Sequence, residues 1–272
     1  MATPTSRLGT VLRDPSRLRG AVARRLQVPV ARWSRLHDLR WRLNSRQALF
    51  AQIYESDSWG SRESGSGTGS ELRATDNIRR RLPDLLSRLG AQSVLDAPCG
   101  DWNWMRHIDL PIKDYYGVDI VPRVIEGNEL RFGGEHRQFA VADLTRDTLP
   151  RADVILCRDC LVHISFQECA MILENFRSTG ATWLLLNTYP EVRRNLNQFT
   201  GKQWRRLNFR LPPFDFPEPM QMLPDGGEVD PSQLALWRLQ ELPPMQAVDR
   251  GRGAYEDNRD GSGRRRGAGP GC

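Results

Sequence analysis

Three aspartates end three short apolar runs, and their spacing constrains the fold more than any other feature of the chain. Asp96 ends Ser-Val-Leu-Asp, Asp119 ends Tyr-Tyr-Gly-Val-Asp, and Asp143 ends Phe-Ala-Val-Ala-Asp. The intervals between them are 23 and 24 residues, which suits one strand-and-helix unit each. In open α/β sheets ligands bind at the carboxyl ends of the strands, and an acid about 20 residues past the first turn accepts from ribose hydroxyls. We therefore expect a nucleoside site at the end of a parallel sheet.

The rest of the chain alternates in the same way. Apolar runs predict strands at 93–97, 115–119, 138–142, 152–157 and 182–188, with a further pair at 205–210 and 234–240. Helical patterns lie at 76–89, 102–108, 121–130 and 166–178. This alternation is typical of an α/β fold. We predict a Rossmann-like, doubly wound, mostly parallel seven-stranded sheet with an N-terminal helical extension.

The two ends of the chain differ from this core. Residues 1–46 are rich in arginine and are expected to form a basic arm, partly disordered or helical, with an amphipathic helix over 31–54. Residues 47–242 are expected to form the folded domain, and the Gly/Arg-rich residues 243–272 a disordered tail. The helix suits packing on the domain, a membrane surface, a nucleic acid or a transit peptide. The Ser/Gly run at 64–70 suits a flexible linker or a backbone cradle over a ligand.

Charge and cysteine content bound the function further. The net charge is +6, but residues 1–50 alone carry eleven arginines against Asp14 and Asp38, so the middle of the chain is acidic. A nucleic acid is therefore a less favoured partner of the domain than a small molecule. The chain holds five cysteines, and the pair Cys157 and Cys160 lacks a second pair to complete a zinc site. We expect no metal, reduced cysteines and a cytoplasmic location.

Hydropathy predicts no membrane span, because no apolar run reaches the roughly 18 residues that a bilayer requires. The basic N-terminus is not followed by an apolar core, so we also expect no signal peptide.

Four motifs together resemble the class I S-adenosylmethionine-dependent methyltransferases. They are Val-Leu-Asp-Ala-Pro-Cys-Gly-Asp at 94–101, Gly-Val-Asp-Ile at 117–120, Val-Ala-Asp-Leu at 141–144 and Ala-Asp-Val-Ile-Leu-Cys-Arg-Asp-Cys at 152–160. A bacterial subgroup with the Pro-Cys-Gly-Asp motif is similar over about 50–242. The resemblance implies S-adenosylmethionine as the cofactor and methyl transfer as the reaction.

The resemblance also implies roles for individual residues. Asp96 and the turn that follows would face the methionine end of the donor, and Asp119 would accept hydrogen bonds from the ribose diol. Asp143 would accept from the adenine amine, with the Leu144 backbone nearby and Ile120 packing on the base. The full set of expected cofactor-binding residues is Asp96, Pro98, Cys99, Gly100, Asp101, Asp119, Ile120, Asp143, Leu144 and Cys157.

The turn departs from the glycine-rich pattern of this superfamily at two positions. Pro98 replaces the first glycine and supplies no N–H, and Trp102 replaces the third. A tryptophan is expected not to adopt the positive φ that glycine allows. Gly100 keeps the central position, where the backbone passes closest to the ligand.

The candidate catalytic residues are Asp159 and His163, because they follow the fourth strand, where acceptors arrive in this superfamily. Either side chain is suited to accept a proton from an alcohol or an amine, and Arg158 to orient an acidic acceptor. Trp204, Phe209, Phe214 and Phe216 suit either an aromatic acceptor wall or ordinary core.

The expected function is methyl transfer to an O or N atom of a small or sugar-containing metabolite. Two alternatives stay open at this point. One is an RNA- or protein-directed methyltransferase that uses the arginine-rich arm, and the other is a non-catalytic protein that binds an adenosine ligand.

Overall fold

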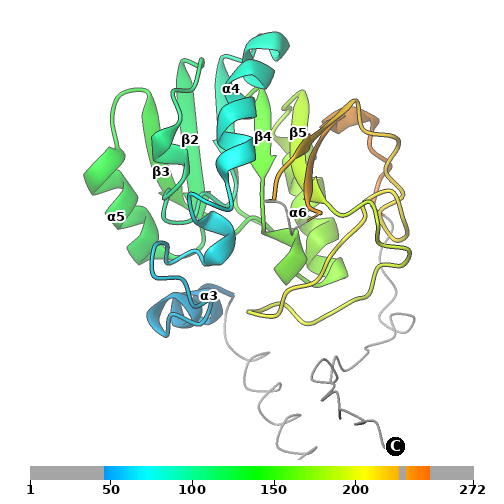
Figure 1. Ribbon diagram of the computed structural model, residues 1–272, viewed down its shortest axis with the longest axis horizontal. Coiled ribbons are helices and arrows are strands. Elements are labelled where there is room, and N and C mark those ends of the chain that lie inside the picture. The colour runs from blue at the N-terminus through cyan, green and yellow to red at the C-terminus, as the bar shows by residue number, and fades with distance from the viewer. Residues whose placement is uncertain (1–45, 227–230, 246–272) are drawn as a thin grey trace, which may run out of the picture. The chain divides into compact units, whose positions relative to one another are not determined.

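A seven-stranded sheet forms the centre of the protein, in a computed structural model that describes residues 46–226 and 231–245 (Figure 1). The strand order is β3-β2-β1-β4-β5-β7-β6, in which β1 to β5 are parallel and β7 is antiparallel to both of its neighbours. The strands are β1 Ser93–Asp96, β2 Asp114–Asp119, β3 Arg137–Val141, β4 Val154–Cys157, β5 Trp183–Thr188, β6 Gln221–Pro224 and β7 Gln233–Arg238. The predicted fold class is confirmed.

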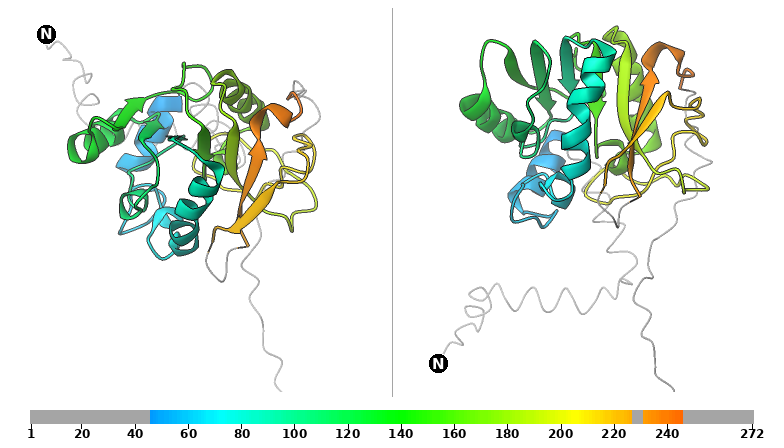
Figure 2. Two further views of the ribbon diagram at one scale, coloured as in Figure 1. Left: turned by 90° about the horizontal axis from the view of Figure 1, so that it is seen from above. Right: turned by 45° about the horizontal axis from the view of Figure 1, so that its top comes forward.

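Alternate residues of each strand divide the core into two clusters, one on each face of the sheet. On β4, Ile155 packs into one cluster, whereas Val154 and Leu156 pack into the other. The first cluster is completed by α6 (Phe166–Ser178), and the second by α4 (Asp76–Leu89) and by α5 (Pro122–Phe132). The view from above shows the sheet between α4 and α6 (Figure 2). Another helix of the described residues, α3 (Arg46–Glu55), lies below the sheet in Figure 1.

Local signals mark the end of α4 and the start of α6, the two longest helices of the described residues. Gly90 closes α4 in the left-handed conformation, with φ of 64°, where a glycine carries no steric penalty. Ser165 caps the start of α6, because its hydroxyl accepts from the Glu168 amide, and the same hydroxyl donates to the Glu168 carboxylate. The sequence prediction therefore matches these helices at both ends.

The sequence prediction was wrong about the sixth strand. Residues 205–210 form no strand: Leu207 and Phe209 are buried, but their carbonyl groups accept single hydrogen bonds from the Tyr189 and Phe216 amides and join no ladder of the sheet. The amide side chain of Asn195 donates to the carbonyl groups of Asn208 and Leu211. The edge strand is instead β6. Its Pro224 argues against a strand in the sequence, but an edge strand tolerates proline.

Two further expectations changed in extent. The helix expected at 102–108 is a single 3₁₀ turn, Met105–His107. The helix expected at 31–54 is described only as α3, and its first part, like the tail at 246–272, lies outside the described residues. Across the described ranges, none of the helices is long and apolar enough to cross a bilayer.

Candidate active site

A cavity of about 410 Å³ opens at the carboxyl ends of the parallel strands. The strand order reverses between β1 and β4, and a crevice forms at such a switch point. Ten of the twelve predicted site residues line the cavity: Asp96, Pro98, Cys99, Gly100, Asp119, Ile120, Asp143, Leu144, Asp159 and His163. The other two lie elsewhere, since Cys157 is fully buried and Asp101 holds a neighbouring loop.

Gly100 forms the point of closest backbone approach in the turn after β1. Its φ is 53°, and a Cβ atom there would lie 2.4 Å from the Ser66 hydroxyl, so only glycine fits. The Gly100 amide donates to the Asp119 carboxylate at 3.2 Å, and Asn128 donates to the Gly100 carbonyl at 2.8 Å. The turn is therefore fixed before any ligand arrives.

Trp102 corrects the expectation that a tryptophan avoids positive φ, because its φ is 58°. The indole packs against the rings of Tyr115, Phe132 and Phe139 with centroids 4.8 to 5.6 Å apart, and the Arg137 guanidinium lies over it at 4.7 Å. Packing of this kind offsets the cost of a left-handed backbone. The departure from the glycine pattern thus serves the core of the domain.

The Ser/Gly run at 64–70 is an ordered cradle and not a flexible linker. Ser64 and Ser66 donate through their hydroxyls, and Gly65 through its amide, to the Asp101 carboxylate at 2.8 to 3.0 Å. Tyr54 of α3 shares a hydrogen bond with the Ser66 hydroxyl at 2.8 Å. Asp101 therefore positions the loop that forms one wall of the cavity.

Two buried carboxylates face this cavity with raised pKa values. Burial raises the pKa of Asp96 to about 7, although the Tyr115 hydroxyl donates to it at 2.5 Å. Burial likewise raises the pKa of Asp119 to about 6, against the lowering effect of the Val121 and Gly100 amides. Both carboxylates lack an adjacent cation among the described salt bridges, so a ligand carrying positive charge and hydroxyl groups would suit them.

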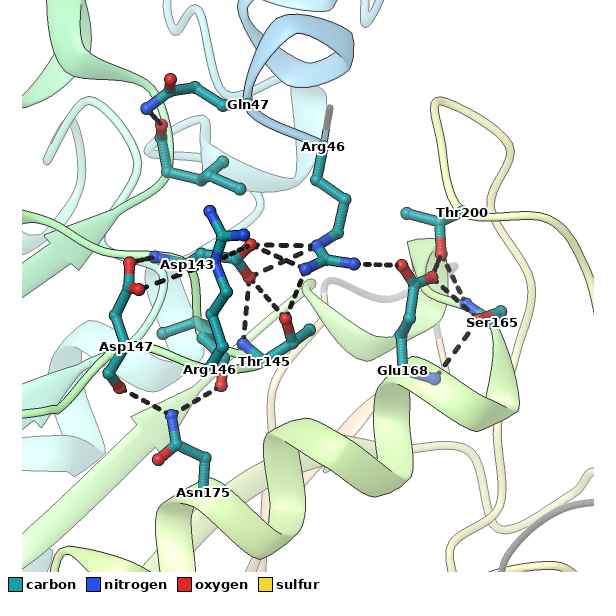
Figure 3. Close-up of polar contacts among 12 residues, drawn as sticks. Arg46, Gln47, Asp143, Thr145, Arg146, Asp147, Ser165, Glu168, Asn175 and Thr200 are labelled. Atoms are coloured by element: carbon teal, nitrogen blue, oxygen red, sulfur yellow. Dashed lines mark hydrogen bonds and ion pairs between the residues drawn. The ribbon is translucent and has the colours of Figure 1, made fainter. Parts of the chain in front are cut away.

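Asp143 has a different environment from the other two acids. Its carboxylate accepts from the Arg46 guanidinium at 2.7 Å and from the Thr145 hydroxyl at 2.7 Å (Figure 3). Burial acts to raise its pKa, but the hydrogen bonds from Arg46 and Thr145 outweigh this and lower it. Arg46 was not among the predicted site residues, because only the tertiary fold brings α3 to the end of β3.

The turn after β4 carries the candidate catalytic groups. Asp159 lies in the left-handed region, with φ of 51°, and Asn187 donates to its carboxylate at 2.9 Å. The buried Arg158 guanidinium pairs with Asp159 at 2.9 Å and with Asp225 at 2.7 Å, and it donates to the Gly69 carbonyl at 2.8 Å. Arg158 therefore fixes the cradle loop and is not available to orient an acceptor.

His163 also lines the cavity, and its tautomer follows from its partners. Its Nδ1 atom lies 2.8 Å from the Gln203 carbonyl, so Nδ1 carries the proton. Burial, together with the nearby Arg205 charge, lowers the pKa of His163 to about 4. The ring is thus neutral at pH 7, and its Nε2 atom is unprotonated.

The aromatic residues divide between wall and core. Trp204 lines the cavity beside Tyr189, with ring centroids 5.6 Å apart. Phe209, Phe214 and Phe216 are buried in the core cluster and do not reach the cavity. Trp59 and Trp104 also line the cavity and were missed, although the Trp-Gly pair before the cradle marks the first of them.

The comparison with known families decides the identity of this domain. A methyltransferase domain family matches residues 73–217, which is more than half of the chain. The chain belongs to this methyltransferase family. The domain is an S-adenosylmethionine-dependent methyltransferase domain, as the four strand-end motifs implied. The family match contains Asp96, Asp119, Asp143, Asp159 and His163 but ends before β6 and begins after α3.

Solved structures similar to this chain include two with bound cofactor or product. Human N-acetylserotonin methyltransferase with S-adenosylmethionine is 17% identical, with a TM-score of 0.49, and the match covers 72% of this chain and 60% of that one. The N-methyltransferase NodS from Bradyrhizobium japonicum with S-adenosylhomocysteine is 16% identical, with a TM-score of 0.49, covering 70% and 98%. The chain thus spans less than two thirds of the human enzyme. A search of curated proteins finds no match.

The methyltransferase cavity fits S-adenosylmethionine in its chemistry. Asp96 offers a carboxylate for the donor's ammonium group, and Asp119 offers one for the ribose hydroxyls. The missing Cβ of Gly100 lets the Ser66 hydroxyl pack against the turn, which places the Ser/Gly cradle at the wall of the cavity. When bound, this cofactor supplies a methyl group on a positively charged sulfur atom.

Binding of the product S-adenosylhomocysteine is expected to release about half a proton at pH 7, because the pKa of free Asp96 is about 7 and a bound ammonium lowers it. Calorimetry in buffers of different ionisation enthalpy measures this release. At pH 9 the release from Asp96 vanishes. Asp96→Asn, which keeps an acceptor for Tyr115, should abolish it at pH 7 as well. Equal release by the variant would contradict the assignment.

Proposed function

We propose that this methyltransferase transfers a methyl group to an O or N atom of a small acceptor, and that His163 accepts the proton. The observation that carries the proposal is the tautomer of His163. Its Nδ1–H donates to the Gln203 carbonyl, so Nε2 is the ring atom that can accept a proton, and the side chain lines the cavity. The sulfonium of the donor is already activated, so alignment and proton removal are the tasks left to the protein.

Asp159 is proposed to position the site and not to receive the proton. Its carboxylate pairs with Arg158 and accepts from Asn187, so its charge is already compensated. A Cβ atom at Gly69 would lie 2.7 Å from the Asp159 carboxylate, which shows how closely the cradle packs on it. Asp159 thereby fixes the distance between the cradle and the end of β4.

The walls of the cavity support a small ring-containing acceptor. Trp59, Trp104, Tyr189 and Trp204 line it and offer flat apolar faces, which suit a planar ring or a sugar. Lys202 is the exposed cation of this wall and forms no described salt bridge. The acidic body of the chain favours a small metabolite over a nucleic acid as the acceptor.

Labelled S-adenosylmethionine, incubated with the full chain and panels of phenols, amines and sugars, tests the proposal. His163→Gln is expected to lower kcat roughly 100-fold and to leave S-adenosylhomocysteine affinity unchanged. Transfer to RNA alone, lost on deletion of residues 1–45, would favour the RNA-directed alternative. Binding of the cofactor without transfer to any acceptor would favour the non-catalytic alternative.

A further inference from the structure

Arg46 joins α3 to two other parts of the cofactor cavity. Its guanidinium donates to Asp143 at 2.7 Å, to Thr145 at 2.5 Å and to Glu168 at 2.8 Å (Figure 3). Asp143 and Thr145 follow β3, whereas Glu168 lies in the first turn of α6. A single side chain at the start of α3 therefore spans the end of the sheet and the end of a helix.

The acceptors of Arg46 are themselves held in place. Glu168 accepts from the hydroxyls of Ser165 and Thr200 through its other oxygen, Oε2. Thr145 donates through both its amide and its hydroxyl to Asp143. The guanidinium thus enters a preformed site of fixed geometry, which is the setting in which a charged hydrogen bond is strongest.

One face of α3 covers the cavity. Arg46, Phe50 and Tyr54 all line it, and their spacing of four residues places them on the same side of the helix. Tyr54 is tied to the cradle at the far end of this face through Ser66, at 2.8 Å. Gln47 adds a bond to the Ile120 carbonyl at 3.2 Å. The helix is therefore fastened at both ends across the cavity.

The Asp143 carboxylate has little capacity left for a ligand in this arrangement. Its Oδ1 atom accepts from Thr145 twice and from Arg46, and its Oδ2 atom accepts from Arg46 twice and pairs with Arg146. A carboxylate offers about four acceptor positions. The contacts to the protein fill them, so a direct hydrogen bond from the adenine amine has no site.

We propose that Arg46 is a positioning residue for the cofactor, which latches α3 over the cavity and uses Asp143 as its anchor. Asp143 then acts on cofactor binding through Arg46 and not by contacting adenine. Release of the cofactor requires the latch to open. This inference rests on the proposed use of S-adenosylmethionine, and it assigns to α3 a role that lies outside the matched family region.

A double-mutant cycle with the full chain tests the latch. Arg46→Gln and Asp143→Asn are each expected to raise the dissociation rate of S-adenosylhomocysteine about tenfold or more, and the double variant should be no worse than either. Arg46→Lys should restore part of the loss. The matched control is Arg146→Gln, which removes a second cation from Asp143 but touches nothing on α3, and its dissociation rate should stay near wild type.

Hydrogen exchange of residues 46–55 without any ligand gives a readout independent of the cofactor. Exchange should rise in Arg46→Gln and Asp143→Asn but not in Arg146→Gln. Additive effects of Arg46→Gln and Asp143→Asn on dissociation, or unchanged exchange in α3, would overturn the latch. Absence of S-adenosylhomocysteine binding by the wild type would instead overturn the proposed cofactor, and the exchange result would still stand by itself.

Discussion

Asp119→Asn is expected to weaken S-adenosylhomocysteine binding by roughly 100-fold or more, because two charge-assisted hydrogen bonds to the ribose would be lost. The Gly100 and Val121 amides donate to different oxygens of Asp119, so the single oxygen of the asparagine retains only one of these two hydrogen bonds. Calorimetric titration of the full chain measures the change. The exposed Asp84 on α4 supplies the control, since Asp84→Asn alters the net charge equally but lies away from the cavity. Equal affinity of Asp119→Asn and wild type would contradict the ribose assignment.

The same variant has a predicted signature in stability. Burial raises the pKa of Asp119 to about 6 in the folded state, above its unfolded value near 4, so folding favours the protonated form. Ionisation of this group therefore lowers the free energy of unfolding of the wild type by up to about 3 kcal/mol as the pH rises from about 4 to 6. Urea titrations of the ligand-free protein at pH 4, 6 and 8 measure the free energy of unfolding. The value for the variant should rise relative to that of the wild type between pH 4 and 6 and not above pH 6. A constant difference would contradict the raised pKa.

Asp225→Ala is expected to lower the free energy of unfolding by about 3 kcal/mol, because it removes one of the two carboxylates that neutralise the buried Arg158. The Asp225 side chain is fully buried, and it also accepts from the Ser232 hydroxyl at 3.1 Å. The remaining partner, Asp159, keeps part of the charge compensation. The cradle should loosen as well, since Arg158 holds it through the Gly69 carbonyl. Thermal unfolding should show a drop of about 6–12 °C.

An exposed ion pair provides the comparison for this experiment. Glu218→Gln removes the partner of Arg210 at 2.5 Å, but both side chains are more than half exposed. A pair of that kind contributes about 1 kcal/mol or less. A similar decrease in the free energy of unfolding in both variants would show that burial of the Arg158 network does not determine how much it contributes to stability.

The sequence predicted which strand ends meet at the cavity, because that signal is topological. Asp96 and Asp119 end the neighbouring strands β1 and β2, and Asp143 follows β3, so the sheet brings all three to one edge. Both Asp96 and Asp119 line the cavity, as does the Gly100 turn. Such features depend on local patterns and on the parallel packing of consecutive strands, which a single sequence carries.

The parts that were missed depend on contacts between distant segments. The segment 205–210 has the apolar content of a strand, but its carbonyl groups accept hydrogen bonds from the Asn195 side chain and the Tyr189 amide. The composition of the Ser/Gly run suits both a linker and a cradle, and only its hydrogen bonds to Asp101, more than 30 residues further on, decide between them.

The sequence by itself predicted the fold class and the edge of the sheet where the cavity opens, because periodicity and strand-end acids are local properties, and its resemblance to a known family implied the methyl donor. Only the tertiary structure decided which groups remain available for a ligand. Arg158 and Asp159 neutralise each other, the Arg46 guanidinium occupies Asp143, and the Gln203 carbonyl sets the tautomer of His163. Those pairings depend on distances between elements that lie far apart in the chain, and no spacing in the sequence encodes them.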